Sequence, residues 1–419
     1  MTGVYSKTWY EDNSIVHIAD ERLSIGKKEH FDFCVIGGGL SGLSCAYHLA
    51  KLGANVALCE HSSIGSGASG RNGGFCSSGW AAGLDQITRL VGPLVSKELE
   101  LIGADGFKWM RKRAFSSKYN TAQPISGIIS LGLRGQRSEL SERLDEVELK
   151  KFVDGPRYKW GRIDNEAFHF HPLNFLKTFL QEVKSHGVKV LENTGAVQVN
   201  GSEIYFLNGS RISFDRMIWA TGGYSIEKNS TLKKYLLPIQ TFICVTSPMP
   251  EILETYIPTR MALGDDRRAG NYFRRLPDGR LLWGMGVSAL NQKSVESIKQ
   301  MGWKNIKAHF PYMITEMKQN NIKFDYAWSG LMAYASHFMP YVGKLNERES
   351  ILSGFGGHGM NTAPIAGKRM ALFLNGDKNM LDPFLEIPRR NVFGLIGRLG
   401  AEFEYRRLRA IDYITEALG

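Results

Sequence analysis

Apolar and polar residues alternate early in the chain in the order strand, helix, strand. Residues 33–36 form a continuous apolar run, as a buried parallel strand requires. Leu40, Leu43, Tyr47 and Ala50 then recur at helical spacing. A second apolar run over residues 55–59 predicts the next strand. The pattern therefore predicts a βαβ unit near the start of the chain.

Similar patterns continue along the rest of the chain. From about residue 84 to 162 the chain is charged and is expected to be a helix-rich insertion, for example over 138–153. The remaining expected elements are a helix over 172–186, strands over 188–191, 196–199, 203–206, 212–214 and 216–219, a strand over 271–275 and a hairpin over 277–283, and helices over 295–310 and 361–374. With no internal repeat and no clear linker, the pattern predicts an α/β fold, α+β overall, with interleaved domains.

The turn of the first unit carries the glycine spacing of a dinucleotide site. Gly37 would allow the tight turn, Gly39 the approach of a pyrophosphate, and Gly42 close packing of helix on strand. Phosphates would sit at the helix N-terminus, where free N–H groups and the helix dipole favour negative charge. Glu60 stands at the separation expected of a carboxylate that binds ribose hydroxyls, and it would repel a 2′-phosphate. The motif predicts that the turn binds NAD or FAD. It disfavours NADP as the cofactor, and it disfavours a purely structural role for these glycines.

Composition narrows the class of protein. The chain of 419 residues has no apolar stretch long enough to span a bilayer and a polar N-terminus, so a cytoplasmic enzyme is expected. Its five cysteines form no C-x-x-C pair, so neither a metal site nor a disulfide framework is expected. The net charge of +11 is dispersed, with one dense cluster at 406–409 after Arg389 and Arg390. A solvated basic helix is the plainest interpretation of that cluster, and partner docking or lipid contact is the alternative.

Three further glycine-rich segments follow the first unit: 65–74, 220–223 and 354–360. The loop 65–74 can press its backbone against a flat polar ligand. With 37–42, and with Pro364 and Gly367, these segments resemble the D-amino acid oxidase/glycine oxidase superfamily of FAD enzymes. The loop most resembles the γ-glutamylputrescine oxidoreductase branch. The resemblance spans about residues 31–376 in four ordered motifs, and it implies FAD as the nucleotide.

The resemblance also implies an architecture. A glutathione-reductase-type FAD-binding Rossmann domain would be interleaved with a substrate domain built on a mixed sheet. The FAD-binding domain would comprise 31–83, 165–235 and 327–385, the substrate domain 84–164 and 236–326, and a C-terminal helical segment 386–419.

Residues of the FAD site are implied position by position. Glu60 would hold the adenosine ribose, the backbone at Ala196 or Val197 would pair with adenine, and residues 357–360 would lie beside the flavin pyrimidine at a helix N-terminus. The full set of cofactor positions is Gly37, Gly39, Leu40, Ser41, Gly42, Glu60, His61, Ser69, Arg71, Asn72, Gly73, Gly74, Ala196, Val197, Thr221, Gly222, Gly357, His358, Gly359 and Met360.

The chemistry that the resemblance implies is oxidation of a C–N bond. Hydride would pass from the carbon beside nitrogen to flavin N5, and the imine would hydrolyse in water. The protein would orient the substrate and accept the ammonium proton. Tyr272, Tyr334 and His337 are the candidate pocket residues, with core packing as the alternative for each. His358 is a further catalytic candidate, although a structural place in its turn is the commoner role.

Two departures from the family pattern bear on the substrate and the flavin. Residues 330–333 lack the arginine that pairs with a substrate carboxylate in glycine oxidase-like members. An amine such as a γ-glutamylputrescine-like or N-alkylated compound is favoured, or an acid held by Arg274 or Arg275. Met332 and Ser336 stand where a covalently attached flavin would need a cysteine, so non-covalent FAD is expected.

The electron acceptor stays open between two classes. One complete fingerprint disfavours a flavin reductase fed by NAD(P)H, so electrons are expected to leave the flavin by another route. Reoxidation by O2 with release of H2O2 is the first expectation. The alternative is a dehydrogenase that passes electrons to a quinone or carrier. A non-catalytic FAD-binding subunit is a further alternative, and the dispersed charge argues against an RNA-modifying enzyme. The oligomeric state stays open.

Overall fold

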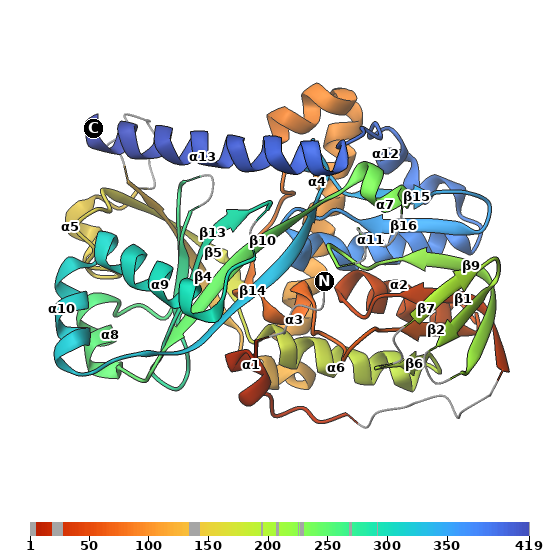
Figure 1. The fold of residues 1–419 in the computed structure, drawn as a ribbon, viewed down its shortest axis with the longest axis horizontal. Helices are drawn as coiled ribbons and strands as arrows, with labels where there is room; N and C mark the ends of the chain where they lie inside the picture. Colours follow the sequence, from red (N-terminus) through yellow and green to blue (C-terminus); the bar gives the residue numbers. More distant parts are fainter. Residues whose placement is uncertain are drawn as a thin grey trace.

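Two eight-stranded sheets form the framework of the computed structural model, and each supports one lobe (Figure 1). The structure describes residues 6–18, 28–133, 143–193, 196–206, 209–224, 226, 230–267, 270–290 and 292–418. The helices are α1 (Trp9–Asp12), α2 (Leu40–Lys51), α3 (Ala68–Arg71), α4 (Leu84–Ala114), α5 (Glu146–Leu149), α6 (Pro172–Ser185), α7 (Ser230–Tyr235), α8 (Pro250–Tyr256), α9 (Val295–His309), α10 (Pro311–Gln319), α11 (Gly359–Leu374), α12 (Asp382–Leu385) and α13 (Gly394–Leu418), with 3₁₀ turns η1 (Ser117–Ala122) and η3 (Lys378–Leu381).

The first sheet contains the predicted βαβ unit. Its main strand order is β15 (Tyr341–Lys344), β16 (Glu349–Ser353), β9 (Arg211–Trp219), β1 (Lys28–Ile36), β2 (Val56–Cys59) and β6 (Lys189–Leu191), and the hairpin of β7 (Ala196–Asn200) and β8 (Glu203–Phe206) pairs with β9. Strand β1 runs parallel to both β2 and β9. Val35 faces one hydrophobic core while Cys34 and Ile36 face another. Burial on both faces explains the continuous apolar run of β1 and confirms its prediction.

The second sheet is mixed, as the predicted fold class required. Its order is β14 (Phe324–Tyr334), β10 (Leu237–Thr246), β13 (Leu281–Ser288), β12 (Tyr272–Arg275), β11 (Ala262–Asp265), β4 (Ile125–Gly132), β5 (Trp160–His169) and β3 (Phe75–Cys76). Most neighbours are antiparallel, but β11 and β4 are parallel. Helices α8, α9 and α10 lie beside this sheet (Figure 1). In the core of this lobe the rings of Phe273 and Trp283 are stacked, and Phe310 packs edge-on against both.

The chain passes between the two sheets several times. Strands β1 and β2 belong to the first sheet, β3 to β5 to the second, β6 to β9 to the first, β10 to β14 to the second, and β15 and β16 to the first. The expected domain boundary at residue 327 falls inside β14, which pairs with β10 along its length. We therefore propose that the boundary lies after Tyr334 and that β3 belongs with the substrate domain.

The region from 84 to 162 differs from its sequence prediction. Helix α4 fills its first part, but the strands β4 and β5 follow and place much of this region within the second sheet. Of the helix expected over 138–153, residues 138–142 lie outside the described residues and only α5 is helical. Glycine and serine within β4, and polar residues along β5, hide the alternating burial that identifies a strand. The helices expected over 172–186, 295–310 and 361–374 are present as α6, α9 and α11.

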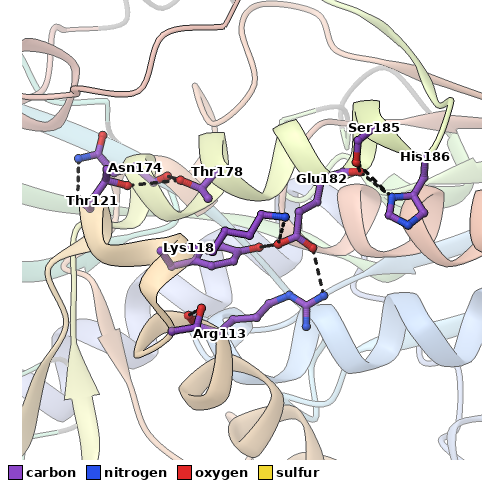
Figure 2. A network of polar contacts seen from close by, with 10 residues as sticks. Arg113, Lys118, Thr121, Asn174, Thr178, Glu182, Ser185 and His186 are labelled. Atoms are coloured by element: carbon purple, nitrogen blue, oxygen red, sulfur yellow. Dashed lines mark hydrogen bonds and ion pairs between the residues drawn. The ribbon is translucent and has the colours of Figure 1, made fainter.

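A buried carboxylate joins α6 to the turn η1 (Figure 2). The Tyr119 hydroxyl donates to Glu182 over 2.7 Å, and Arg113 and Lys118 approach the same carboxylate at 3.4 and 3.3 Å. Burial alone would raise the pKa of Glu182, but the tyrosine and the two cations hold it below its ordinary value. At the other end of α6, Asn174 donates to the Thr121 carbonyl over 2.9 Å. The network fixes α6 beneath the first sheet's helices.

Helix α1 joins the two lobes near the N-terminus. The Trp9 indole N–H donates to Asp278 over 2.8 Å, and the ring of Tyr10 packs edge-on against His171 and Trp328. Both aromatic side chains are buried, with Tyr10 fully enclosed. His171 caps α6 in the first lobe, whereas Trp328 lies on β14 of the second sheet. This short helix therefore belongs to the core between the lobes.

Candidate functional site

One large cavity lies between the two lobes. Its volume is about 1460 Å³, and residues of both sheets line it. From the first sheet come Ile36, Trp219 and Gly354, which stand at or just beyond the carboxyl ends of the parallel strands β1, β9 and β16. Ligands of open α/β sheets bind at such carboxyl ends. Residues of β10, β12, β13 and β14 close the cavity from the second lobe.

The turn between β1 and α2 has room only for glycine at two positions. Gly37 has a φ of +111°, and a Cβ atom there would lie 2.5 Å from the Ala220 carbonyl oxygen. A Cβ at Gly42 would lie 2.0 Å from the Gly37 carbonyl oxygen. Both are closer than real Cβ contacts, so the glycines are required by packing. Gly39 lines the cavity at the N-cap of α2.

Glu60 closes this turn from the end of β2. Its carboxylate accepts backbone N–H groups from Gly38 at 2.8 Å and Ser62 at 3.1 Å. Burial raises the pKa of Glu60, although those two N–H groups oppose the shift. The residue lines the cavity beside His61. This geometry fits a carboxylate that accepts hydroxyl hydrogens from a sugar.

The loop after Glu60 is held by its own polar groups. The Ser69 hydroxyl accepts the Leu40 N–H over 3.1 Å, which joins the loop to the start of α2. The Asn72 amide donates to the carbonyls of Ala68 and Ser69, and its oxygen accepts the Gly74 N–H over 2.7 Å. Ser69 and Asn72 line the cavity, but these bonds show that they also shape the loop itself.

Arg71 connects this loop to the second sheet. Its guanidinium donates to the Ser329 carbonyl over 3.0 Å, and its own carbonyl accepts the Trp328 indole N–H over 2.8 Å. Gly73 packs so closely on Tyr272 that a Cβ would lie 2.6 Å from the ring. Gly74 faces away from the cavity toward the Phe170 carbonyl. The loop is therefore a wall shared by both lobes.

Two further turns complete the first-lobe side. Thr221 and Gly222 follow β9 and line the cavity. The Thr221 hydroxyl is buried without a hydrogen-bond partner in the described part of the chain, so it can bond a ligand. Residues 357–360 lie at the N-terminus of α11, with Gly357 at a φ of +85°. Burial lowers the pKa of His358, which keeps its imidazole neutral at neutral pH.

Two tyrosines line the cavity on the second-lobe side. Tyr272 lies over Gly284, where a Cβ would come within 2.0 Å of its ring, so that glycine makes space for the tyrosine. The Tyr334 hydroxyl lies 3.9 Å from the Met332 sulfur. Burial raises the pKa of both hydroxyls, so both stay protonated at neutral pH. They can donate hydrogen bonds but cannot act as bases there.

Three predicted substrate-pocket residues lie away from the cavity. His337 bonds the Tyr341 hydroxyl and the Pro388 carbonyl, each at 3.1 Å, because it belongs to the turn after β14. Arg274 points into the core, where it donates to Gly73, Phe170 and Tyr10. Arg275 pairs with Glu254 at 2.6 Å on the opposite side. None of the three is a lining residue, so these pocket assignments are corrected.

The structure brings most of the other predicted positions together. The cavity is lined by Gly37, Gly39, Ser41, Glu60, His61, Ser69, Arg71, Asn72, Gly73, Thr221, Gly222, Tyr272, Tyr334, Gly357, His358, Gly359 and Met360. Leu40, Gly42 and Gly74 support the wall from behind. The side chains of Ala196 and Val197 lie outside the described residues, although Val199 of the same strand lines the cavity. No cluster suited to a metal ion occurs within the described ranges.

The sequence interpretation missed one part of the cavity wall. Thr241 of β10 and Gly286 and Val287 of β13 are lining residues, and the Thr241 hydroxyl donates to the Gly286 carbonyl over 3.1 Å. The pairing of β10 with β13 shifts register at this point, as in a β-bulge. The glycines at 284 and 286, inside an otherwise apolar strand, were the available signal.

The wall fits a dinucleotide as the sequence motifs predicted. The glycine turn allows a pyrophosphate to approach α2, Glu60 presents a carboxylate, and the unpartnered Thr221 hydroxyl faces the same space. The cavity then continues to the two tyrosines. Its length from Glu60 to Tyr334 crosses both lobes, which suits a cofactor whose reactive end meets a substrate in the second lobe.

Comparisons with known proteins agree with this geometry. The model of the family described as FAD dependent oxidoreductase (DAO) matches residues 32–372. The chain is 27% identical to the probable oxidoreductase OrdL of Haemophilus influenzae, over 87% of this chain and 88% of that protein. It is also 27% identical to γ-glutamylputrescine oxidoreductase of Escherichia coli, over 85% and 86%. The crystal structure of glycine oxidase from Bacillus cereus superposes with a TM-score of 0.64 at 17% identity, over 86% of this chain and 99% of that one.

Proposed function

The chain belongs to the family of FAD-dependent oxidoreductases, and from this premise we propose that it oxidises an amine whose reacting carbon carries no carboxylate. Members of this family act on amines and amino acids. The similarity to γ-glutamylputrescine oxidoreductase supports a substrate of that kind. The proposal rests on one observation, which is the charge of the residues that line the substrate end of the cavity.

FAD is the cofactor of this family, and we propose that its nucleotide end lies against the first lobe. Gly37, Gly39 and the start of α2 would hold the pyrophosphate, Glu60 the ribose, and residues 357–360 the flavin. Bound there, FAD supplies the two-electron acceptor for oxidation of the C–N bond. We propose non-covalent binding, since all cysteines of the described chain are buried and Met332 faces the cavity where an attachment residue would stand.

Among the residues that the structure describes, none at the substrate end of the cavity is placed to pair with a carboxylate. Among the described lining residues, Arg71 is the one lysine or arginine, and its guanidinium bonds the Ser329 carbonyl. Arg274 and Arg275 both point elsewhere. The walls near Tyr272 and Tyr334 are formed by neutral side chains and backbone. Because a buried carboxylate without a partner is costly, this surface favours an amine over a standard α-amino acid.

Three lining residues have roles that their protonation allows. Tyr272 and Tyr334 carry protonated hydroxyls and would orient the substrate nitrogen or a distal amide by hydrogen bonding. Burial lowers the pKa of His358 and disfavours its protonated form, so its neutral imidazole would serve as a hydrogen-bond partner of the bound nitrogen or the flavin. Apolar groups of Leu331 and Phe355 would exclude water from the reacting carbon.

An anaerobic titration tests the substrate proposal. The FAD-loaded protein is mixed without oxygen with γ-glutamyl amines, polyamines, N-methyl amino acids and D- and L-amino acids, and the visible flavin absorbance is followed. We expect bleaching by an amine without an adjacent carboxylate. Bleaching by α-amino acids alone would overturn the substrate class but leave the cofactor assignment. No bleaching by any compound would instead favour a non-catalytic FAD-binding subunit.

The electron acceptor needs a separate measurement. We propose reoxidation by O2, with H2O2 as the product. An oxygen electrode with the substrate found above should then record oxygen consumption at the rate of turnover. Reduction of an artificial dye without oxygen consumption would instead support a dehydrogenase that passes electrons to a quinone or carrier.

A further inference from the structure

Helix α13 turns an apolar face away from the protein. Leu395, Ile396, Leu399, Phe403 and Ile414 have 63%, 74%, 52%, 69% and 56% of their surface exposed. At about 100° per residue these five side chains fall within about one third of the helix circumference. The helix runs along one edge of the molecule and carries the C-terminus (Figure 1). Leu395, Ile396, Leu399 and Phe403 form an exposed stripe, called the α13 face below, along the first part of the helix, and Ile414 lies on the same arc beyond Arg406.

The flank of α13 beside this stripe is attached to the protein by charged groups, and Tyr405 and Leu408 are half-buried on the side that faces the protein. The Glu402 carboxylate accepts the Ser288 hydroxyl and the Ala289 N–H, both at 3.0 Å. Arg398 donates to the Ala289 carbonyl over 2.7 Å, and Arg409 to the Val287 carbonyl over 2.6 Å. A helix on the surface of a water-soluble protein normally turns its large apolar side chains inward, whereas α13 leaves these five exposed. The arrangement indicates that another apolar phase covers the α13 face.

We propose that α13 lies in the interface of an anionic membrane, with the α13 face among the lipid chains. Arg406 lies within the arc of the stripe and Arg407 lies beside it, with 66% and 50% of their side-chain surface exposed, and each pairs with a glutamate on α13. Arg389 and Arg390 are exposed just before the helix. The whole chain carries a net charge of +11. Apolar residues flanked by arginines on a positively charged protein match a bilayer surface of negative charge.

Charge also argues against a second copy of the chain as the occupant. A symmetric pair through α13 would place the same arginines opposite one another and bring together two proteins of net charge +11. Lipid headgroups of negative charge would instead be attracted to those arginines. The charged contacts of Arg398, Glu402 and Arg409 stay with the protein in either case. Lipid is therefore the occupant that both the apolar and the charged residues fit.

Seating α13 on a membrane brings the cavity close to the bilayer. Arg409 of α13 bonds the carbonyl of Val287, and Val287 is a lining residue of the cavity. One strand, β13, therefore separates the membrane-bound helix from the substrate end. This placement does not depend on which amine the protein oxidises.

Vesicle flotation of the full-length, FAD-loaded protein tests the proposal. The probes are vesicles of phosphatidylcholine alone and of phosphatidylcholine with phosphatidylglycerol. We expect binding to the mixed vesicles only, and its loss at about 1 M salt, where the screening length falls to about 3 Å. The double variant Ile396→Ser/Phe403→Ser should partition about tenfold or more weakly, because two exposed anchors are lost. Tyr312→Ser, at a residue 71% exposed on α10, is the matched control and should bind like the wild type.

Three results would overturn the proposal. The first is no binding to mixed vesicles, and the second is equal binding by the wild type and the double variant. The third is a concentration-dependent dimer in sedimentation velocity that the double variant loses, without vesicle binding, which would assign the α13 face to a second copy. Unchanged circular dichroism and flavin absorbance of the double variant exclude misfolding. Vesicle flotation measures partitioning and not turnover, so a negative flotation result is distinct from a negative result in the amine oxidation assay.

Discussion

Replacing Tyr10 by phenylalanine removes one buried hydroxyl from the contact between the lobes. Arg274 donates to that hydroxyl over 3.1 Å and, through its Nε, to the Gly73 carbonyl over 2.8 Å. Gly73 lines the cavity, so Tyr10 supports the cofactor loop through one intermediate residue. Burial raises the pKa of Tyr10, which keeps the hydroxyl protonated at neutral pH. The phenylalanine ring would retain the packing against His171 and Trp328.

The expected loss follows from that single contact. A hydrogen bond to a charged group contributes about 1.5–3 kcal/mol to the free energy of unfolding. For a chain of 419 residues, an unfolding entropy of about 2.1 cal/mol/K per residue converts this to a fall in Tm of about 2–3 °C. The Kd for FAD should rise by less than about tenfold, because Arg274 keeps its bonds to Gly73 and Phe170. Thermal melting followed by tryptophan fluorescence, and titration of apoprotein with FAD, measure the two quantities.

The matched control is Tyr312→Phe, since this tyrosine is 71% exposed on α10. It should melt with the wild type and bind FAD equally well. If Tyr10→Phe also melts within about half a degree of the wild type, the hydroxyl does not support Arg274. The reasoning that α1 stabilises the cofactor loop would then be refuted.

Three other outcomes can be checked on the same preparation. Gly42→Ala should yield protein without bound FAD, because the new Cβ would lie 2.0 Å from the Gly37 carbonyl oxygen; visible absorbance measures the bound flavin. Gly83→Ala is the control, because its Cβ would meet no atom within 4 Å, and it should retain FAD. Glu182→Gln should lower the free energy of unfolding by about 1–3 kcal/mol at pH 7. The pKa of Glu182 in the folded protein lies below 4.5. The difference in free energy of unfolding between Glu182→Gln and the wild type, measured by denaturant titration, should therefore shrink as the pH falls below 4.5. Burial lowers the pKa of His309 to about 2, so below pH 6.5 this residue is neutral in the folded state but protonated in the unfolded state. The free energy of unfolding of the wild type should therefore fall by about 1.4 kcal/mol per pH unit in that range because of this residue. In His309→Gln the free energy of unfolding should fall less steeply with acid.

The nucleotide end of the site could be predicted because its signals are local. Gly37 is required by its own φ of +111°, Gly42 by its contact with Gly37 in the same turn, and Glu60 directly follows the very next strand. Requirements of this kind fix which residues stand at given separations along the chain, so they can be recognised in the sequence. The loop 65–74 and the turn 354–360 were found for the same reason, since positive φ angles at Gly74 and Gly357 demand glycine.

The substrate end could not be predicted in the same way. Arg274 and Arg275 are adjacent on one strand, yet alternate side chains of a strand point to opposite faces, and both faces here are occupied by core. His337 is polar but serves a turn through Tyr341 and Pro388. Which of these residues meets the cavity depends on contacts between segments far apart in sequence. Thr241 is the opposite case: it does line the cavity, but no local motif in the sequence marks it.

The repeated passage of the chain between its sheets limits how this protein can be re-engineered. The second sheet draws its strands from 75–76, 125–169 and 237–334, while the first sheet draws its strands from 28–59, 189–219 and 341–353. A new substrate preference therefore cannot be transplanted as one contiguous cassette. At least two separate segments would have to be exchanged together, with each junction matched to an unchanged cofactor lobe. Point changes at lining positions such as Thr241 and Met332 offer a route that leaves every junction intact.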